Sequence, residues 1–201
     1  MERRLIILAA LAAAGKYADI PEAAAAAAAA GAPPAAIRET LVFLVPYCGW
    51  PTALNALLAV AADPASPPVT DGEGGLDSAD RVTRRGLGLA TARRVNNGFD
   101  RVTDRLAQID PALVDHLAES AYGYIYNRPG LDLSERELLA VAILAVQSHH
   151  RQLLYHLQGA RNVGASDTDI DGVIDALGEV DGNAAERARR AFRDILPSLD
   201  R

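Results

Sequence analysis

Apolar residues recur along this chain with the spacing of helix faces, and Gly and Pro residues interrupt them. Over the first part of the chain, this pattern predicts helices at 2–15, 19–30, 33–46 and 51–62. Gly31 and Gly49 mark two of the breaks, and Asp19 is the expected N-cap of the second helix. No segment has the pattern of a credible strand, so the sequence predicts an all-α fold.

Residues 63–78, DPASPPVTDGEGGLDS, are rich in Pro, Gly and Asp and have no apolar period. We interpret them as a linker. The pattern after this linker predicts six further helices, at 79–107 (interrupted near 96–98), 111–126, 134–148, 150–163, 167–178 and 183–196. The helix at 134–148 has no charged residue after its first turn, so we expect it to be buried on all sides.

An internal repeat relates the start of the chain to a segment in its second half. Residues 2–32 align without a gap with residues 135–165, at an offset of 133. Identical residues occur in both copies at Glu2, Arg3, Leu5, Ala9, Leu11, Ala12, Ala27 and Gly31 of the first segment. The opening stretch, MERRLIILAALAAAG, has the basic head and apolar run of a secretory signal peptide. The repeat favours the other interpretation, a first structural helix, and we therefore expect a cytoplasmic protein.

Composition narrows the classes of function. Hydrophobic residues make up 50% of the chain, with Ala the most frequent, and aromatic residues only 5%, a mixture that suits closely packed helices. The net charge of -6 argues against a nucleic-acid surface. No apolar run reaches the length of a membrane span, so we expect no membrane partner. Cys48 is the only cysteine, which excludes an internal disulfide and a CxxC motif.

Several motifs together carry a family resemblance. The stretch YGYIYNRPGLDLSERELLAVAILA, followed by LLYHLQGARNVGAS, resembles the carboxymuconolactone decarboxylase family, which shares its fold with alkylhydroperoxidase D-like proteins. The motifs are an aromatic-Gly pair at Tyr122, an Arg-Pro-Gly-Leu loop at Arg128, an Arg-Glu-Leu helix start at Arg136, and His156 eight residues before Gly164. The earlier stretch IRETLVFLVPYCGWPTALNAL is similar to the family's downstream segment.

The resemblance implies two tandem alkylhydroperoxidase-like helical repeats. The first would be a half-repeat over 1–62, and the second a fuller repeat over 79–201, with the linker at 63–78 between them. Family members assemble from such helical hairpins, so we expect a homo-oligomer: a trimer, a dimer or a hexamer. Each repeat has few aromatic residues and therefore a small core, so association between chains is also plausible on physical grounds.

The sequence also departs from the family. The peroxidase branch carries a CxxCxxxH motif, and its two Cys positions are occupied here by His149 and Gln152. Because thiol-based peroxide reduction needs a thiolate and a resolving Cys, we do not expect that activity. The two halves also differ from each other, since Ala23 and Arg4 stand where the second half has His156 and Glu137.

Three polar residues are candidates for acid–base chemistry. His149, Gln152 and His156 have the spacing i, i+3, i+7 and share a face if one helix holds all three. Imidazoles in a mostly apolar pocket are natural general acids and bases near neutral pH. The alternative is a core histidine together with a histidine at a helix start.

Three other side chains from the two halves complete the candidate site. Glu137 is a candidate proton donor or relay, although the sequence SERE also has the form of a capping box in which Ser134 is the N-cap. Arg128 could hold a substrate carboxylate. The resemblance places Glu39 on the pocket wall, although Glu39 could instead be a solvated surface charge. Tyr47, from the same half, is a further candidate for substrate binding.

We expect no cofactor and no metal. His149, Gln152, His156 and Glu137 could offer ligands, but Gln is a poor zinc ligand and no HExxH motif is present. The leading hypothesis is a cofactor-independent lyase or isomerase that acts on a small carboxylated or enolisable substrate. The alternative is a non-catalytic helical oligomer or ligand-binding protein that kept the fold.

Overall fold

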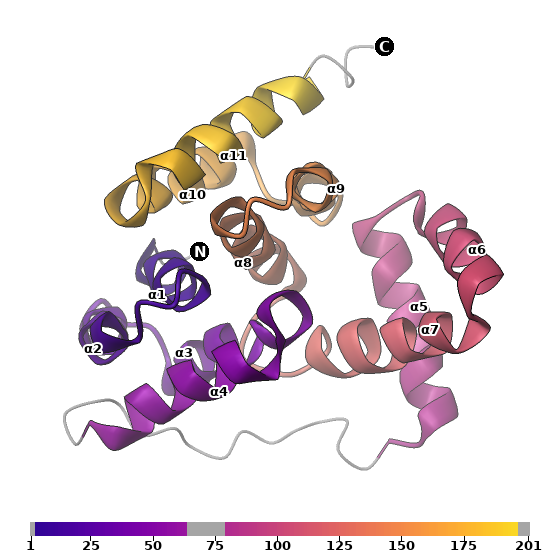
Figure 1. Cartoon of the computed structure of the whole chain (residues 1–201), viewed down its shortest axis with the longest axis horizontal. Helices are drawn as coiled ribbons and strands as arrows, with labels where there is room; N and C mark the ends of the chain where they lie inside the picture. Colours follow the sequence, from indigo (N-terminus) through magenta and orange to yellow (C-terminus); the bar gives the residue numbers. More distant parts are fainter. Residues whose placement is uncertain (1–2, 64–78, 197–201) are drawn as a thin grey trace.

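A computed structural model describes residues 3–63 and 79–196 (Figure 1). The proposed linker therefore lies outside the described residues, apart from Asp63, which follows α4. The N-terminal part forms four α-helices and a short 3-10 turn: α1 (Arg3–Ala13), η1 (Tyr17–Asp19), α2 (Ile20–Ala29), α3 (Pro34–Val42) and α4 (Val45–Ala62).

The rest of the described chain is also helical. Its elements are α5 (Arg81–Val95), α6 (Phe99–Ile109), α7 (Pro111–His116), the π-helix η2 (Leu117–Ile125), α8 (Leu133–Val146), α9 (His150–Asn162), α10 (Asp167–Val180) and α11 (Gly182–Ile195). No strand occurs in residues 3–63 or 79–196. The all-α prediction is confirmed, as is the interruption near 96–98, which separates α5 from α6.

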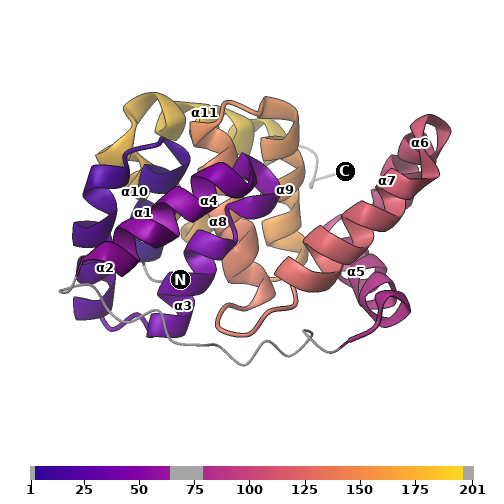
Figure 2. The same ribbon diagram turned by 60° about the horizontal axis from the view of Figure 1, so that its bottom comes forward.

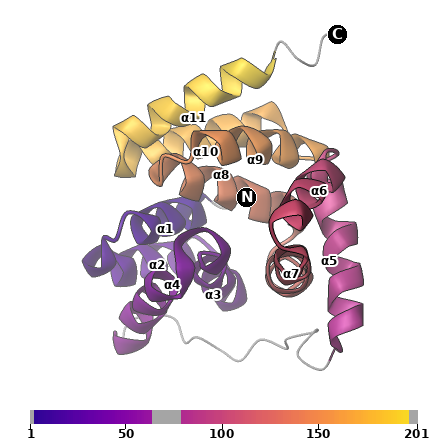
Figure 3. The same cartoon turned by 45° about the vertical axis from the view of Figure 1, so that its right-hand side comes forward.

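The internal repeat is visible in the order of the helices. Adding 133 to the bounds of α1, α2 and α3 gives 136–146, 153–162 and 167–175, which fall within α8, α9 and α10. In Figure 3 the group α1–α4 packs beneath the group α8–α11. The chain thus contains two tandem, unequal copies of one helical unit.

Helix α8 lies at the centre of the fold. It packs against α1, α9, α10 and α11, and every residue from Arg136 to Ala145 is buried. This confirms the prediction of a helix buried on all sides. Helix α1 is buried along most of its length and contacts α2, α8 and α10. The stretch that resembles a signal peptide therefore forms part of the core.

Helices α5, α6 and α7, together with η2, form an arm that projects from the rest of the molecule (Figure 2). The arm is held together where α5 crosses η2 at Gly88 and Gly123. A Cβ at Gly88 would clash with the carbonyl of Ala118, and one at Gly123 with the carbonyl of Arg84. Glycine is required at this crossing because the two backbones touch directly.

Local details correct the sequence analysis at two points. The capping box of α8 consists of Asp132 and Glu135, not of Ser134 and Glu137. Asp19 makes no side-chain capping bond to α2. The predicted break at Gly49 is confirmed as a kink within α4, at which φ is 77° and ψ is 169°.

Within the described residues, no single helix combines the length and apolarity needed to cross a membrane, although the sharply bent pair α3–α4 meets that test by length and composition.

Candidate functional site

A buried hydrogen-bond chain is centred on Glu137. The Glu137 side chain, in the first turns of α8, is fully buried. Its Oε1 accepts a hydrogen bond from the Tyr126 hydroxyl at 2.7 Å, and its Oε2 lies 2.9 Å from Nδ1 of His156 on α9. A carboxylate partner favours the imidazole tautomer with its proton on Nδ1, which leaves Nε2 able to accept a proton.

Tyr47 of α4 brings the N-terminal copy into this site. Its hydroxyl lies 2.5 Å from the hydroxyl of Tyr126, and its ring meets the His156 ring edge to face, with 5.4 Å between centroids. Burial, and then the charge of Glu137, raise the pKa of both Tyr47 and Tyr126 well above the usual range. Both phenols therefore stay protonated and act as hydrogen-bond donors near neutral pH.

Gly159 makes room for the carboxylate. It lies one turn after His156 on α9, and a Cβ at this position would clash with Oε2 of Glu137. The close approach of α9 to α8 therefore depends on a residue without a side chain. Gly159 thereby allows the Glu137–His156 pair to form inside a densely packed helix interface.

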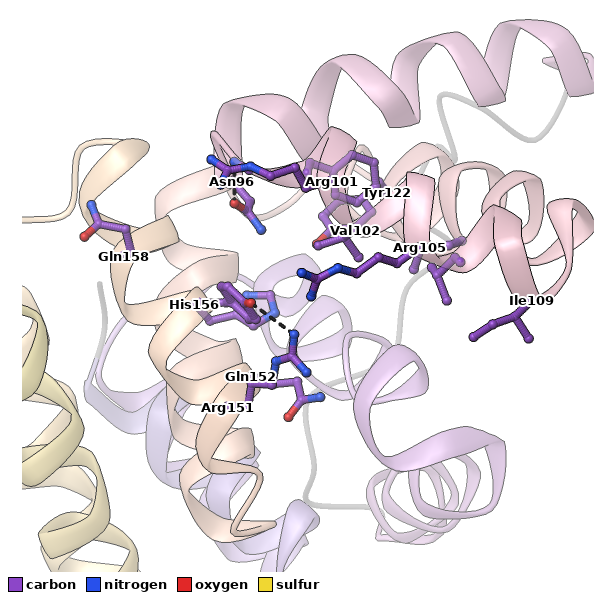
Figure 4. Close-up of a pocket in the computed structure, with 15 residues that line it drawn as sticks. Asn96, Arg101, Val102, Arg105, Ile109, Tyr122, Arg151, Gln152, His156 and Gln158 are labelled. Atoms are coloured by element: carbon purple, nitrogen blue, oxygen red, sulfur yellow. Dashed lines mark hydrogen bonds between the residues drawn. The ribbon is translucent and has the colours of Figure 1, made fainter.

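A pocket of about 750 Å³ opens in front of His156, between α6 of the arm and α9 (Figure 4). The His156 side chain is only 12% exposed and lines this pocket, together with Gln152 one turn earlier on the same helix. Phe99 and Tyr122 form part of the wall, and their rings meet edge to face. The pocket therefore combines an apolar wall with a histidine that a buried carboxylate holds in place.

The charged side chains that line the pocket are all basic. They are Arg101 and Arg105 on α6 and Arg151 on α9, and no Asp or Glu is among the lining residues. Arg151 donates a hydrogen bond of 3.4 Å to the hydroxyl of Tyr155. This bond, and the charges of the three arginines, lower the pKa of Tyr155, which also lines the pocket.

A second buried carboxylate, Glu39 of α3, lies in a cluster of arginines. Arg128 makes hydrogen bonds of 3.0 to 3.2 Å to both Glu39 oxygens, and Arg38 makes one of 3.2 Å. The fully buried Arg136 lies 3.5 Å from Glu39, and its guanidinium stacks over the ring of Phe43. Phe43 in turn packs against Tyr47, so this ionic cluster adjoins the tyrosine pair.

The structure brings some of the predicted residues together and separates others. His156, Glu137 and Tyr47 meet in one network, and Gln152 lines the adjoining pocket. His149 is exposed and is not among the lining residues.

His149 lies apart from this face because α9 begins after it. Ser148 has a φ of 60° in the turn before the helix, and His149 takes the N-cap position. Arg128 and Glu39 are bound to each other in the ionic cluster and do not line the pocket. Glu39 is thus a buried charge and not a solvated one.

Several residues of the site were not predicted from the sequence. Tyr126 was not predicted to be a site residue, although it lies four residues after Tyr122 and so shares a helix face with it. Arg101 and Arg105 have the same spacing on α6, which could have indicated a basic stripe. No local signal pointed to Gly159, because its importance comes from a contact with a different helix.

No group of three or more His, Cys, Asp or Glu residues is placed to hold a metal ion within residues 3–63 and 79–196. The chemical groups offered by the pocket are an imidazole with a carboxylate partner, a primary amide and guanidinium groups.

Fold and site define a class of protein: an all-α protein of tandem helical units with a buried Glu–His pair at the base of a pocket. The model of the carboxymuconolactone decarboxylase family matches residues 1–62 and 111–194. The chain belongs to this family, and its two matched segments fit the two unequal repeats. Comparison with curated proteins gives no match.

Proposed function

We propose that this protein is a cofactor-independent lyase or isomerase that moves a proton in a small carboxylated or enolisable molecule. The observation that carries the proposal is the hydrogen bond between Nδ1 of His156 and the buried carboxylate of Glu137, at the base of the pocket. A carboxylate in this position orients the imidazole and stabilises the imidazolium that forms when Nε2 takes a proton.

The proposed chemistry uses side chains of this chain. In an isomerisation, His156 Nε2 removes a proton from a carbon next to a carbonyl and returns it to another carbon. In a decarboxylation, the carbon–carbon bond breaks, its electron pair passes to the carbonyl as CO2 leaves, and the imidazolium of His156 protonates the carbon. In this proposal the amide of Gln152, which lines the same pocket, donates a hydrogen bond to the enolate oxygen.

Tyr126 and Tyr47 have a supporting role in this proposal. Their hydroxyls extend the hydrogen-bond chain behind Glu137 and keep its carboxylate directed at His156. Their raised pKa values keep both phenols protonated while His156 exchanges protons. Thiol-based peroxide reduction receives no support, since Cys48 is the only cysteine of the chain.

The test is solvent exchange, which requires no knowledge of the natural substrate. A panel of 2-oxo acids, 3-oxo acids and carboxylated lactones in D2O is followed by proton NMR. We expect the protein to exchange the acidic carbon-bound proton of at least one compound, or to decarboxylate it. His156→Gln should slow this reaction by about a hundredfold or more, whereas His150→Gln, at an exposed histidine outside the pocket, should not.

The alternative is a non-catalytic helical protein that kept the fold. It is favoured by the loss of the pair from the first half, where Arg4 and Ala23 stand in place of Glu137 and His156. The same panel separates the two candidates. Activity that is absent across the panel, or unchanged in His156→Gln, would support the non-catalytic alternative and reject the acid–base proposal.

A further inference from the structure

Guanidinium groups approach the pocket from both of its walls. Arg105 extends from α6 into the space in front of α9, where Arg151 lies (Figure 4). Arg101 lies one turn earlier on α6, near Asn96. All three charges act on the hydroxyl of Tyr155, whose pKa they lower, so they converge on one region of the pocket.

The three arginine side chains are exposed, and their like charges create a positive potential that attracts an anion. No carboxylate lines the pocket, and neither Arg101 nor Arg105 has an ion-pair partner within the described residues. Other arginines of the arm do have such partners, for example Arg81 with Glu119 and Arg85 with Asp115. Like charges that face one another across a concave surface concentrate anions there, even though the whole chain has a net charge of -6.

One wall of the pocket lies outside the part of the chain that the family model matches. The model covers residues 1–62 and 111–194, and these segments hold Tyr47, Glu137 and His156. Helix α6 falls between them, so Arg101 and Arg105 belong to a segment that the family model does not describe. The groups proposed to move the proton and the arginines of α6 therefore come from different parts of the sequence.

We propose that Arg105 of α6 and Arg151 of α9 clamp the anionic group of the substrate, with Arg101 reinforcing the positive potential, so that the arm determines specificity. This inference rests on the proposed function, in which His156 acts on the bound molecule. Guanidinium groups are suited to this task because their planar forks bind carboxylate and phosphate with paired hydrogen bonds.

The apolar residues of the lining indicate the body of the substrate. Phe99, Tyr122, Val102 and Leu106 give the pocket an apolar and partly aromatic wall next to the arginines. Such a wall favours an unsaturated or aromatic body over a polyhydroxylated one. The inferred substrate is thus a small organic anion with a flat apolar body, whose reactive carbon lies near His156.

The test measures the binding of three defined probes to the purified protein by calorimetry at low salt. The probes are benzoate, phenyl phosphate and the neutral analogue benzamide. We expect at least one anion to bind roughly tenfold or more tightly than benzamide, and to lose affinity as salt is added. Preference for benzoate identifies a carboxylate ligand, and preference for phenyl phosphate identifies a phosphate monoester.

Matched variants test whether Arg105 and Arg151 cause the preference for an anion. Arg105→Gln and Arg151→Gln should each weaken binding of the preferred anion about tenfold or more, and should leave benzamide binding unchanged. Arg94→Gln makes the same change of charge at an exposed arginine of α5 that does not line the pocket. It should bind the anion as the unchanged protein does, and circular dichroism should show equal helicity in all variants.

The inference would be overturned by equal affinity for the anions and benzamide, by no binding of either anion at millimolar concentration, or by equal losses in Arg94→Gln and Arg105→Gln.

Failure of the clamp proposal can be told apart from failure of the proposed function. His156→Gln should still bind the anion, because the clamp does not include the imidazole. Proton exchange that survives in a protein without anion preference would reject the clamp alone.

Discussion

Glu39 and Glu137 are both fully buried carboxylates, yet they have opposite surroundings. Glu39 is held by Arg38, Arg128 and Arg136, so its charge is more than balanced. Glu137 has a tyrosine hydroxyl and a histidine as partners. The first carboxylate is bound by three guanidinium groups in a structural ion-pair cluster, whereas the second orients an imidazole that lines the pocket.

The arginine cluster predicts a large stability effect. Glu39→Gln removes the negative charge and leaves guanidinium groups buried without compensation, which should reduce the free energy of unfolding by about 3–5 kcal/mol. The control is Glu179→Gln. Its partner Arg3 is the repeat equivalent of Arg136, but that ion pair is about half exposed, and exposed pairs contribute less than about 1 kcal/mol. Urea unfolding measures both variants, and equal losses would contradict the structural role of Glu39.

A substitution at Gly159, which lies at the Glu137–His156 contact, is predicted to change both stability and proton exchange. Gly159→Ala places a methyl group against Oε2 of Glu137, so it should cost about 1–3 kcal/mol of stability through overpacking and should reduce proton exchange by His156. Gly172→Ala is the matched control, because this glycine lies within α10 and its added Cβ would meet open space. The control should be neutral or stabilising by up to about 1 kcal/mol. Thermal unfolding and the exchange assay together check the prediction, which fails if Gly159→Ala behaves like the control.

The tyrosine pair predicts alkaline sensitivity. The pKa values of Tyr47 and Tyr126 are raised in the folded protein, first by burial and then by Glu137, so their ionisation favours the unfolded state. Their contribution to stability is fully present below pH of about 10, the pKa of an exposed tyrosine, and is lost as the pH rises above it. Tyrosinate absorbance and circular dichroism, recorded together in an alkaline titration, should show these two phenols ionising only as helicity is lost. Their ionisation in a protein that is still fully helical would contradict the buried network.

The thiol of Cys48 is predicted to react slowly with alkylating reagents. Burial raises the pKa of its thiol to about 11, so only about one molecule in a thousand carries the thiolate at pH 8. Alkylation by iodoacetamide, followed by mass spectrometry, should be slow at neutral pH and should accelerate about tenfold for each pH unit up to pH of about 10. The urea-unfolded chain is the control and should react much faster. Rapid alkylation of the folded protein at pH 7 would show that the thiol is more accessible than its surroundings indicate.

The helices were largely predictable from the sequence because the apolar period and its interruptions are local properties. The break between α5 and α6 near residues 96–98 is an example. The π-helical form of η2 was not predictable, because it occurs where η2 crosses α5 with the backbones in contact. The capping box of α8 was predicted two residues too late, since Asp132 and Glu135 have the same spacing as Ser134 and Glu137.

The candidate site was predictable only in part. Glu137 and His156 were both candidates for one site, and the structure brings them into hydrogen-bond contact. The partner of Arg128 is 89 residues away in the sequence, so its pairing with Glu39 left no local signal. His149 was expected on the face of His156, but the turn at Ser148 starts the helix after it. Contacts between distant segments decided the first two outcomes, and a local turn decided the third.

The arm has a consequence for protein engineering. Its helices α5 and α6 lie between the two segments that the family model matches, and glycines pack α5 directly onto η2. The α6 part of the proposed ligand clamp is therefore separate in sequence from the proposed acid–base pair. Grafting a different sequence at the outer positions of α6 would then retarget the scaffold to new compounds while the proposed base, His156, stays aligned.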